Sequence, residues 1–239
     1  MRCRPEMMRL YAVTDRAWTK KKSLIEQVEE AICGGKKKSL IEQVEEAICG
    51  GATCIQLREK NLDEEAFLRE AIEMQKLCET YQVPLIINDH VEIAKQCKAA
   101  GVHLGQKDME AGRARGILGP KMILGVSART VEQAVQAERA GADYLGVGAV
   151  FQTSTKTDAK EISHAILKEI CESVNIPVVA IGGIGKQNIE ALAGSGIAGV
   201  ALVSVVFAAE DIEQECRGLL KQIERISGTI KTNRKNRVR

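Results

Sequence analysis

The residues of this sequence best suited to chemistry are three cations and two carboxylates, each placed at or just after the end of a short apolar run. The cations are Arg58, Lys60 and Lys156, and the carboxylates are Asp89 and Asp108. Cations that converge from different runs suit an anion with more than one charge, such as pyrophosphate, because charge-assisted hydrogen bonds favour it. Two carboxylates near bound phosphates suit Mg²⁺, which takes one or two carboxylates plus phosphate oxygens and water. The set therefore predicts a polyanion site with Mg²⁺.

A second anion site is indicated later in the chain. The stretch from Gly182 to Gly185 is rich in glycine, and Val203 and Ser204 end the next apolar run. In barrel enzymes, backbone N–H groups of such loops commonly hold a phosphate. The glycines alone are a weak signal, since glycine also serves simply to permit a tight turn.

Several of these residues also have a purely structural interpretation. Arg58 with Glu59, or Lys60 with Asp89, could form no more than surface ion pairs. His103 falls inside an apolar run, where a role in the core is favoured over a role as a ligand. What favours a functional site is the shared position of all the candidates at the ends of apolar runs.

Eight such apolar runs alternate with longer amphipathic stretches. The runs are Leu10 to Thr14, Cys54 to Arg58, Leu85 to Asn88, Gly101 to Gly105, Met122 to Ser127, Tyr144 to Phe151, Pro177 to Gly182 and Gly199 to Ser204. Near-continuous apolar runs are typical of parallel strands covered by helices. Eight such α/β units favour a (β/α)8 TIM barrel, a closed parallel eight-stranded sheet, over an open doubly wound sheet. In such a barrel, reactive residues lie at the carboxyl ends of the strands, where the candidates fall.

One feature interrupts the alternation. Residues 20–35 read KKKSLIEQVEEAICGG, and residues 36–51 repeat these sixteen residues without a change. Each copy has a capping-box start, Ser23 with Glu26 or Ser39 with Glu42, and a Gly-Gly stop. The pattern indicates a recent or engineered tandem duplication of the first barrel helix.

A barrel has one place for that helix, so the two copies compete for it. If the first copy docks, the extra segment follows it at the amino-terminal face of the barrel. If the second copy docks, the extra segment enters the loop after the first strand, at the catalytic face. We expect the first copy to dock, because the insertion then avoids the active-site rim.

Composition limits the classes of protein that fit. A chain of 239 residues, 45% hydrophobic and with a net charge of +2, can bury a core and has no general affinity for nucleic acid or membranes. Its 8 cysteines form no CxxC or Cys/His cluster, which is typical of reduced thiols in a cytoplasmic protein. We expect one barrel domain over residues 1–226 and a basic, disordered segment over residues 227–239.

The motifs resemble those of one family. LYAVTD, QLREK, IIND, GVHLGQKD, GVSA, DYLGVGAVFQTSTK, IPVVAIGGI and ALVS occur in the order and approximate spacing of the thiamine-phosphate synthase family. The resemblance covers residues 9 to about 212, apart from the repeated sixteen. QLREK, the two aspartates and TSTK are specific to that family, whereas IGGI is common to many phosphate-binding barrels.

The resemblance implies an activity and a role for each motif. The activity joins 4-amino-2-methyl-5-pyrimidinylmethyl diphosphate to a thiazole phosphate and releases pyrophosphate, with Mg²⁺ as cofactor and a homo-oligomer as a candidate assembly. The implied pyrimidine diphosphate site is Gln56, Leu57, Arg58, Glu59, Lys60, Asn88, Ser127 and Lys156, of which Arg58, Lys60, Ser127 and Lys156 are catalytic. The implied Mg²⁺ ligands are Asp89 and Asp108, and the implied thiazole phosphate site is Thr153, Ser154, Thr155, Gly183, Val203 and Ser204.

Two departures and two alternatives accompany this resemblance. Gln152 stands where the family usually has proline, and the repeated stretch could crowd the catalytic face. The related thiazole tautomerases place a catalytic histidine just after the fifth strand, where this chain has Ala128 and Arg129. The other alternative is a non-catalytic phosphate-binding barrel, such as an engineered duplication scaffold.

Overall fold

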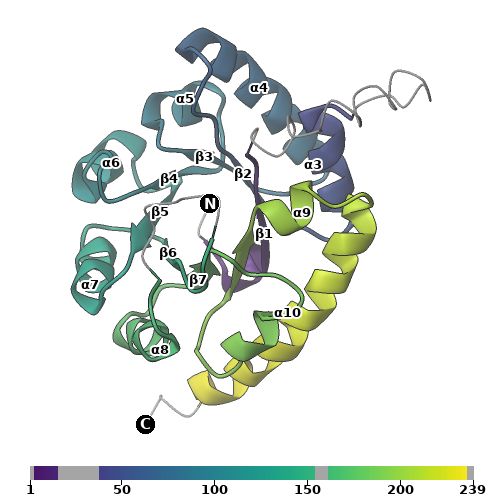
Figure 1. Ribbon diagram of the computed structural model, residues 1–239. Coiled ribbons are helices and arrows are strands. Elements are labelled where there is room, and N and C mark those ends of the chain that lie inside the picture. Colours follow the sequence, from purple (N-terminus) through teal and green to yellow (C-terminus); the bar gives the residue numbers. More distant parts are fainter. Residues whose placement is uncertain (1–2, 16–37, 154–160, 236–239) are drawn as a thin grey trace.

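The computed structural model describes residues 3–15, 38–153 and 161–235, with side chains described as far as residue 226. Within these residues, parallel strands close into a barrel whose strand order is the order of the sequence (Figure 1). The strands are β1 (Leu10–Val13), β2 (Cys54–Leu57), β3 (Leu85–Asn88), β4 (Gly101–Leu104), β5 (Ile123–Ala128), β6 (Tyr144–Gly148), β7 (Val178–Ile181) and β8 (Gly199–Leu202). The predicted (β/α)8 barrel is confirmed, because β1 pairs with β8 and leaves no open edge.

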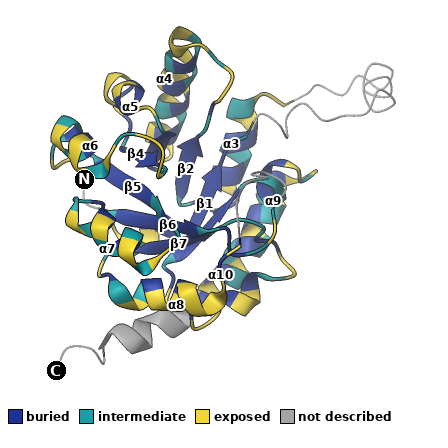
Figure 2. Cartoon of the chain, turned by 60° about the vertical axis from the view of Figure 1, so that its left-hand side comes forward, coloured by how far each residue is buried: buried dark blue, intermediate teal, exposed yellow. Residues whose placement is uncertain are grey.

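Side chains alternate between two apolar layers along each strand. Tyr11 and Val13 point into the barrel, where a cluster from β1, β2, β3, β5, β6, β7 and β8 fills the interior. Leu10 and Ala12 point outward and join the larger layer between the strands and the helices. Figure 2 shows this arrangement as buried strands surrounded by helices that are buried on one side and exposed on the other. The amino-terminal end of the barrel is filled by Met7 and Met8 of the 3₁₀ helix η1 (Pro5–Met8).

Helices surround the barrel, connecting successive strands and, after β8, following the last one. They are α3 (Leu40–Cys49), α4 (Glu64–Thr80), α5 (Val91–Gln96), α6 (Ala111–Leu118), α7 (Val131–Arg139), α8 (His164–Ser173), α9 (Ser204–Phe207) and α10 (Ile212–Lys235), with the 3₁₀ helix η2 (Ile189–Leu192) between β7 and β8. Helix α10 runs along the outside of the barrel beside α3 (Figure 1). In the part of the chain that the structure describes, no helix combines the length and the apolar character needed to cross a membrane.

Helix α3, which connects β1 to β2, is formed by the second copy of the repeated sequence. Its first turn has the predicted capping box, in which Ser39 and Glu42 bond each other's backbone N–H groups. Its buried side chains are Gln43, Val44, Ala47 and Ile48. The expectation that the first copy docks is therefore wrong. The first copy lies outside the described residues, in the connection between β1 and α3.

The residues that follow each Gly-Gly pair explain why the second copy takes this place. After the second copy, Ala52 is buried, and the Thr53 hydroxyl accepts from the Leu10 N–H at 3.0 Å and donates to the Leu10 carbonyl at 3.2 Å. After the first copy, the same two positions would hold Lys36 and Lys37. Docking of the first copy would therefore put Lys36 in the buried place of Ala52, which is unfavourable, whereas Thr53 would still directly precede β2.

The carboxyl-terminal boundary also differs from the expectation. The backbone of α10 continues to Lys235, so the prediction of a disordered segment from residue 227 is wrong up to that point. Residues 227–235 contain few strong helix formers, but a helix already anchored by buried Leu219, Ile223 and Ile226 can extend past its last core contact, because propagation is easier than nucleation. Residues 236–239 lie outside the described residues.

Candidate active site

At the carboxyl ends of β1 and β2, Arg58 is held by two residues that follow β1. Its guanidinium Nη1 lies 2.6 Å from Oδ2 of Asp15, and the two side chains are only 14% and 12% exposed. Its backbone N–H donates to the Thr14 hydroxyl at 3.0 Å. The sequence also allowed a surface ion pair between Arg58 and Glu59. In the structure the guanidinium of Arg58 pairs with Asp15, and this nearly buried pair fixes it at the rim.

A chain of hydrogen bonds crosses the barrel interior from Gln56 on β2 to Ser127 on β5. Gln56 Nε2 donates to the Tyr11 hydroxyl at 2.8 Å, and that hydroxyl lies 2.8 Å from the Tyr144 hydroxyl. The Tyr144 hydroxyl lies 3.0 Å from His103 Nδ1, and His103 Nε2 lies 2.9 Å from Ser127 Oγ. Two predicted site residues on opposite parts of the barrel are thus joined through the core.

Burial determines the protonation of the two tyrosines in this chain. Burial raises the pKa of Tyr11 and of Tyr144 well above the ordinary phenol value of 10.0. Both hydroxyls therefore keep their protons at neutral pH and act as donors as well as acceptors. His103 is 9% exposed and lies in the core, as the sequence indicated.

The two predicted metal-binding carboxylates lie on the neighbouring loops after β3 and β4. Asp89 has a left-handed backbone at φ 65° and donates its N–H to the His103 carbonyl at 2.8 Å. Asp108 is exposed, and its Oδ2 accepts from the Gly105 N–H at 2.7 Å. Asn88, the residue before Asp89, is buried at the end of β3. Because β3 and β4 are paired, these loops share one part of the rim.

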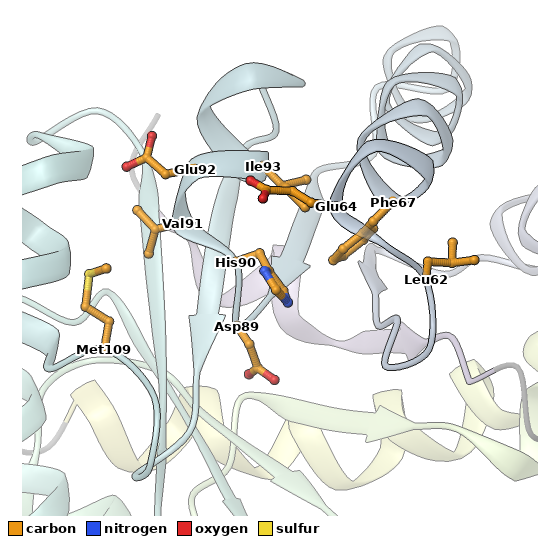
Figure 3. A pocket seen from close by; sticks show the side chains of 9 residues that line it. All are labelled: Leu62, Glu64, Phe67, Asp89, His90, Val91, Glu92, Ile93 and Met109. Carbon is orange, nitrogen blue, oxygen red and sulfur yellow. The ribbon is translucent and has the colours of Figure 1, made fainter.

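A cavity of about 290 Å³ lies beside Asp89, between the loops after β2, β3 and β4 (Figure 3). The Phe67 ring in its wall meets the His90 ring edge-on, with centroids 5.2 Å apart. Its other lining residues are Leu62, Glu64, Val91, Glu92, Ile93 and Met109. Three carboxylates disfavour a phosphate ligand here in the absence of a cation, so the cavity is a poor match for the predicted polyanion.

On the opposite part of the rim, the loop after β7 packs against the loop after β6. Gly183 has φ 65°, and a Cβ placed there would lie 2.3 Å from the Gln152 carbonyl oxygen. The Asn188 side chain then holds the loop, because its Nδ2 donates to the Gly183 carbonyl and its Oδ1 accepts from the Gly185 N–H, both at 2.8 Å. Glycine is required at 183 for both conformation and contact.

Other predicted site residues have different surroundings. Leu57 is buried in the layer between strands and helices, so its side chain faces away from the barrel interior. Glu59 is buried and Lys60 is exposed. Thr153, Val203 and Ser204 are partly buried at the ends of the loops after β6 and β8. Ser154, Thr155 and Lys156 lie outside the described residues, so the convergence of three cations stays a prediction.

Three residues that the sequence did not predict as site members are Asp15, Tyr11 and Tyr144, which the hydrogen bonds above link to Arg58, Gln56 and Ser127. Asp15 ends the LYAVTD motif, and its position after β1 is the same kind of strand-end position as the residues that were chosen. The tyrosines were counted as apolar members of strands. Their proximity to Gln56 and His103 can be inferred only when the register between the strands is known.

Comparisons with known proteins identify the family of this chain. The family described as thiamine monophosphate synthase matches residues 10–206. A thiamine-phosphate synthase from Ruminiclostridium cellulolyticum is 49% identical over 212 residues, covering 89% of this chain and 93% of that protein. One from Clostridium tetani is 46% identical over 210 residues, covering 88% and 93%.

A solved structure gives the same result. The thiamine phosphate pyrophosphorylase from Pyrococcus furiosus is similar with a TM-score of 0.80 and 36% sequence identity, covering 93% of this chain and 98% of that one. The family match spans every barrel strand and the rim residues described above, and the relatives are matched over nearly their full length. The chain therefore belongs to the thiamine monophosphate synthase family.

Proposed function

We propose that this chain joins 4-amino-2-methyl-5-pyrimidinylmethyl diphosphate to a thiazole phosphate, giving thiamine phosphate and pyrophosphate. The relatives named as thiamine-phosphate synthases support this activity. The observation that carries the proposal is that Gln56, Arg58, Asn88, Asp89 and Ser127, which match the family motifs, share the carboxyl-terminal rim of the barrel.

The two substrates would bind on opposite parts of this rim. The pyrimidine diphosphate would lie across β2, β3 and β5, with Arg58, Lys60 and Lys156 around its phosphates. The thiazole phosphate would lie at the loops after β6, β7 and β8, against Thr153, Ser154, Thr155, Gly183, Val203 and Ser204. The tight packing of Gly183 on the loop after β6 supports this second position, because it brings the two loops together in one wall.

Mg²⁺ fits the donor set on the loops after β3 and β4. Within the described ranges, no group of three or more His, Cys, Asp or Glu side chains is placed to hold a metal by itself. Asp89 and Asp108 supply two carboxylates on adjacent loops, and the diphosphate would supply further oxygens. That combination is the one Mg²⁺ prefers, so these residues would hold it together with the substrate.

The reaction needs no general base, because the attacking thiazole nitrogen already has a free lone pair. The aminopyrimidine ring stabilises positive charge at its exocyclic methylene, so the carbon–oxygen bond to the diphosphate can break before the new bond is complete. Arg58, Lys60 and Lys156 would then stabilise the charge that develops on the leaving pyrophosphate. Mg²⁺ held by Asp89 and Asp108 would supply additional Lewis-acid stabilisation of that charge.

One assay tests this function against the alternatives. The full chain is mixed with both phosphorylated substrates and Mg²⁺, and thiamine phosphate and pyrophosphate are measured together. We expect both products in equal amounts, and none when either substrate is left out. Isomerisation of a thiazole substrate without release of pyrophosphate would instead support a tautomerase. Binding of both substrates without any product would support a non-catalytic barrel.

We also propose that the repeated sixteen residues arose by tandem duplication of the helix between β1 and β2. The identity of residues 20–35 with residues 36–51, and the docking of the second copy as α3, support this. The extra copy would then be an insertion in a loop of the catalytic face. An assay of the chain lacking residues 20–35 tests whether this insertion limits turnover.

A further inference from the structure

The hydrogen-bond chain from Gln56 to Ser127 has a direction. The Gln56 Nε2 amide can only donate, so the Tyr11 hydroxyl accepts from it and must donate its own proton elsewhere. The nearest strong acceptor is the Tyr144 hydroxyl, at 2.8 Å, whereas the neighbouring Cys54 sulfur is a weak acceptor. Tyr144 accepts from Tyr11 and therefore donates onward.

The onward donation sets the tautomer of His103. With Tyr144 donating to Nδ1 at 3.0 Å, that nitrogen carries a lone pair, and the imidazole proton is on Nε2. Nε2–H then donates to Ser127 Oγ at 2.9 Å. The Ser127 hydroxyl can then donate its own proton to a further acceptor. Within the described residues, no protein atom accepts that proton, so a bound ligand could do so.

The barrel interior has room for this chain because of two glycines. A Cβ on Gly125 would lie 2.2 Å from Cζ of the Tyr144 ring, and a Cβ on Gly146 would lie 2.9 Å from Cε1 of the His103 ring. Any larger residue at either position would displace one of these rings. Gly125 therefore leaves space for the Tyr144 ring, and Gly146 leaves space for the His103 ring, the two rings in the middle of the hydrogen-bond chain.

We propose that Tyr11, Tyr144 and His103 are positioning residues that hold Ser127 as a hydrogen-bond donor toward an acceptor atom of the pyrimidine diphosphate. The acceptor is a ring nitrogen or a phosphate oxygen of that substrate, and never its amino group. This rests on the role proposed above for Ser127 in binding that substrate. A further consequence is that His103, with its proton on Nε2, cannot take a proton from Ser127, so the pair does not form a nucleophile and base.

The tautomer of His103 tests the direction of the chain without any substrate. The protein has 3 histidines, so a long-range ¹H–¹⁵N correlation spectrum at pH 8 distinguishes the protonated and unprotonated ring nitrogens of each. We expect the His103 proton on Nε2 in the free protein. A proton on Nδ1, or on both nitrogens, would overturn the proposal whether or not the chain makes thiamine phosphate.

Two phenol-to-phenyl variants then test the positioning role. Tyr144→Phe removes the donor to Nδ1, so we expect an added Nδ1–H population and a KM for the pyrimidine diphosphate raised about ten-fold. The KM for the thiazole phosphate should change less than about two-fold. Tyr11→Phe leaves Tyr144 able to donate to Nδ1, so the His103 tautomer should be unchanged in that variant.

The matched control is Tyr81→Phe, which removes a phenol hydroxyl that donates to Glu45 on the surface. It should change neither the tautomer nor either KM. If Tyr144→Phe leaves the tautomer unchanged, or raises both KM values equally, the chain has only a structural role and the proposal fails.

Discussion

The guanidinium of Arg58 and the carboxylate of Asp15 form a nearly buried ion pair, 2.6 Å apart, at the carboxyl ends of β2 and β1. Neither residue can be moved without affecting the other, because an uncompensated charge in such a place is costly. Arg58 therefore depends on Asp15 for its position as well as on its own strand.

Asp15→Asn removes the charge of this partner while keeping its size. We expect the free energy of unfolding to fall by about 2 kcal/mol, less than for a fully buried pair because some exposure remains. We expect kcat/KM for the pyrimidine diphosphate to fall about ten-fold, because Arg58 is no longer fixed beside the leaving group. Urea unfolding and steady-state kinetics measure the two effects.

The control for this variant is Glu65→Gln on α4, where Glu65 and Arg69 form a pair with side chains 85% and 64% exposed. An exposed pair contributes little, so this variant should change neither stability nor kinetics measurably. If Asp15→Asn leaves kcat/KM unchanged or raises it, Asp15 serves only to screen the charge of Arg58.

Asp89→Asn tests the proposed Mg²⁺ site. Asp89 has φ 65°, a conformation that asparagine also adopts readily, so the variant should fold with little strain. Losing one of two carboxylates should raise the Mg²⁺ concentration needed for half-maximal turnover at least ten-fold, which a titration of activity with Mg²⁺ measures. Asp63→Asn, a change at an exposed helix cap where asparagine caps equally well, should leave that concentration unchanged.

Stability at high pH follows from the buried phenols. Because burial raises the pKa of Tyr11 and Tyr144 above 10.0, the folded chain keeps protons that the unfolded chain has lost. The stabilisation is complete below pH 10 and is lost as the pH rises, by about 1.4 kcal/mol per pH unit for each group. Urea unfolding between pH 8 and pH 11 should show this decline, and Tyr144→Phe should reduce its slope above pH 10. An identical slope in the variant would mean that Tyr144 ionises normally in the folded protein.

The barrel could be predicted from the sequence because each strand is a nearly continuous apolar run with its own boundary signals. Cys54–Leu57 and Gly199–Leu202, for example, lie within the predicted runs. The docking of one copy of the repeat over the other was harder to predict, because the two copies are identical. The signal was outside them, in Ala52, a buried residue whose equivalent after the first copy is Lys36.

The candidate site could be predicted only where a residue both has a reactive side chain and ends a strand. Arg58, Asp89 and Ser127 meet this condition. Tyr11 and Tyr144 do not, because they lie inside strands and look like core residues. Their contact depends on the register of a closed barrel, in which 133 residues of sequence separate two hydroxyls that lie 2.8 Å apart. Periodicity alone contains no information about such a contact.

The identical copies supply a matched pair of variants. Ile48→Ala truncates a buried side chain of α3 and should lower the free energy of unfolding by roughly 2–4 kcal/mol. Ile32→Ala is the same change at the same place in the first copy, and it should lower that free energy by less than about 0.5 kcal/mol. Equal losses in the two variants, measured by urea unfolding, would show that both copies contribute to the folded core.

Gly183→Ala tests the loop that would bind the thiazole phosphate. The added methyl would lie 2.3 Å from the Gln152 carbonyl oxygen, so the loops after β6 and β7 must separate. We expect the KM for the thiazole phosphate to rise at least ten-fold, while the KM for the pyrimidine diphosphate changes little. Gly119→Ala is the control, because Gly119 also has a left-handed backbone, φ 67°, but no atom within 4 Å of an added methyl. Both variants carry the backbone strain of alanine at positive φ, about 1 kcal/mol, and only the first carries the collision. A rise in KM shared by both variants would therefore reflect lost stability, and a rise confined to Gly183→Ala would locate the thiazole phosphate at this loop.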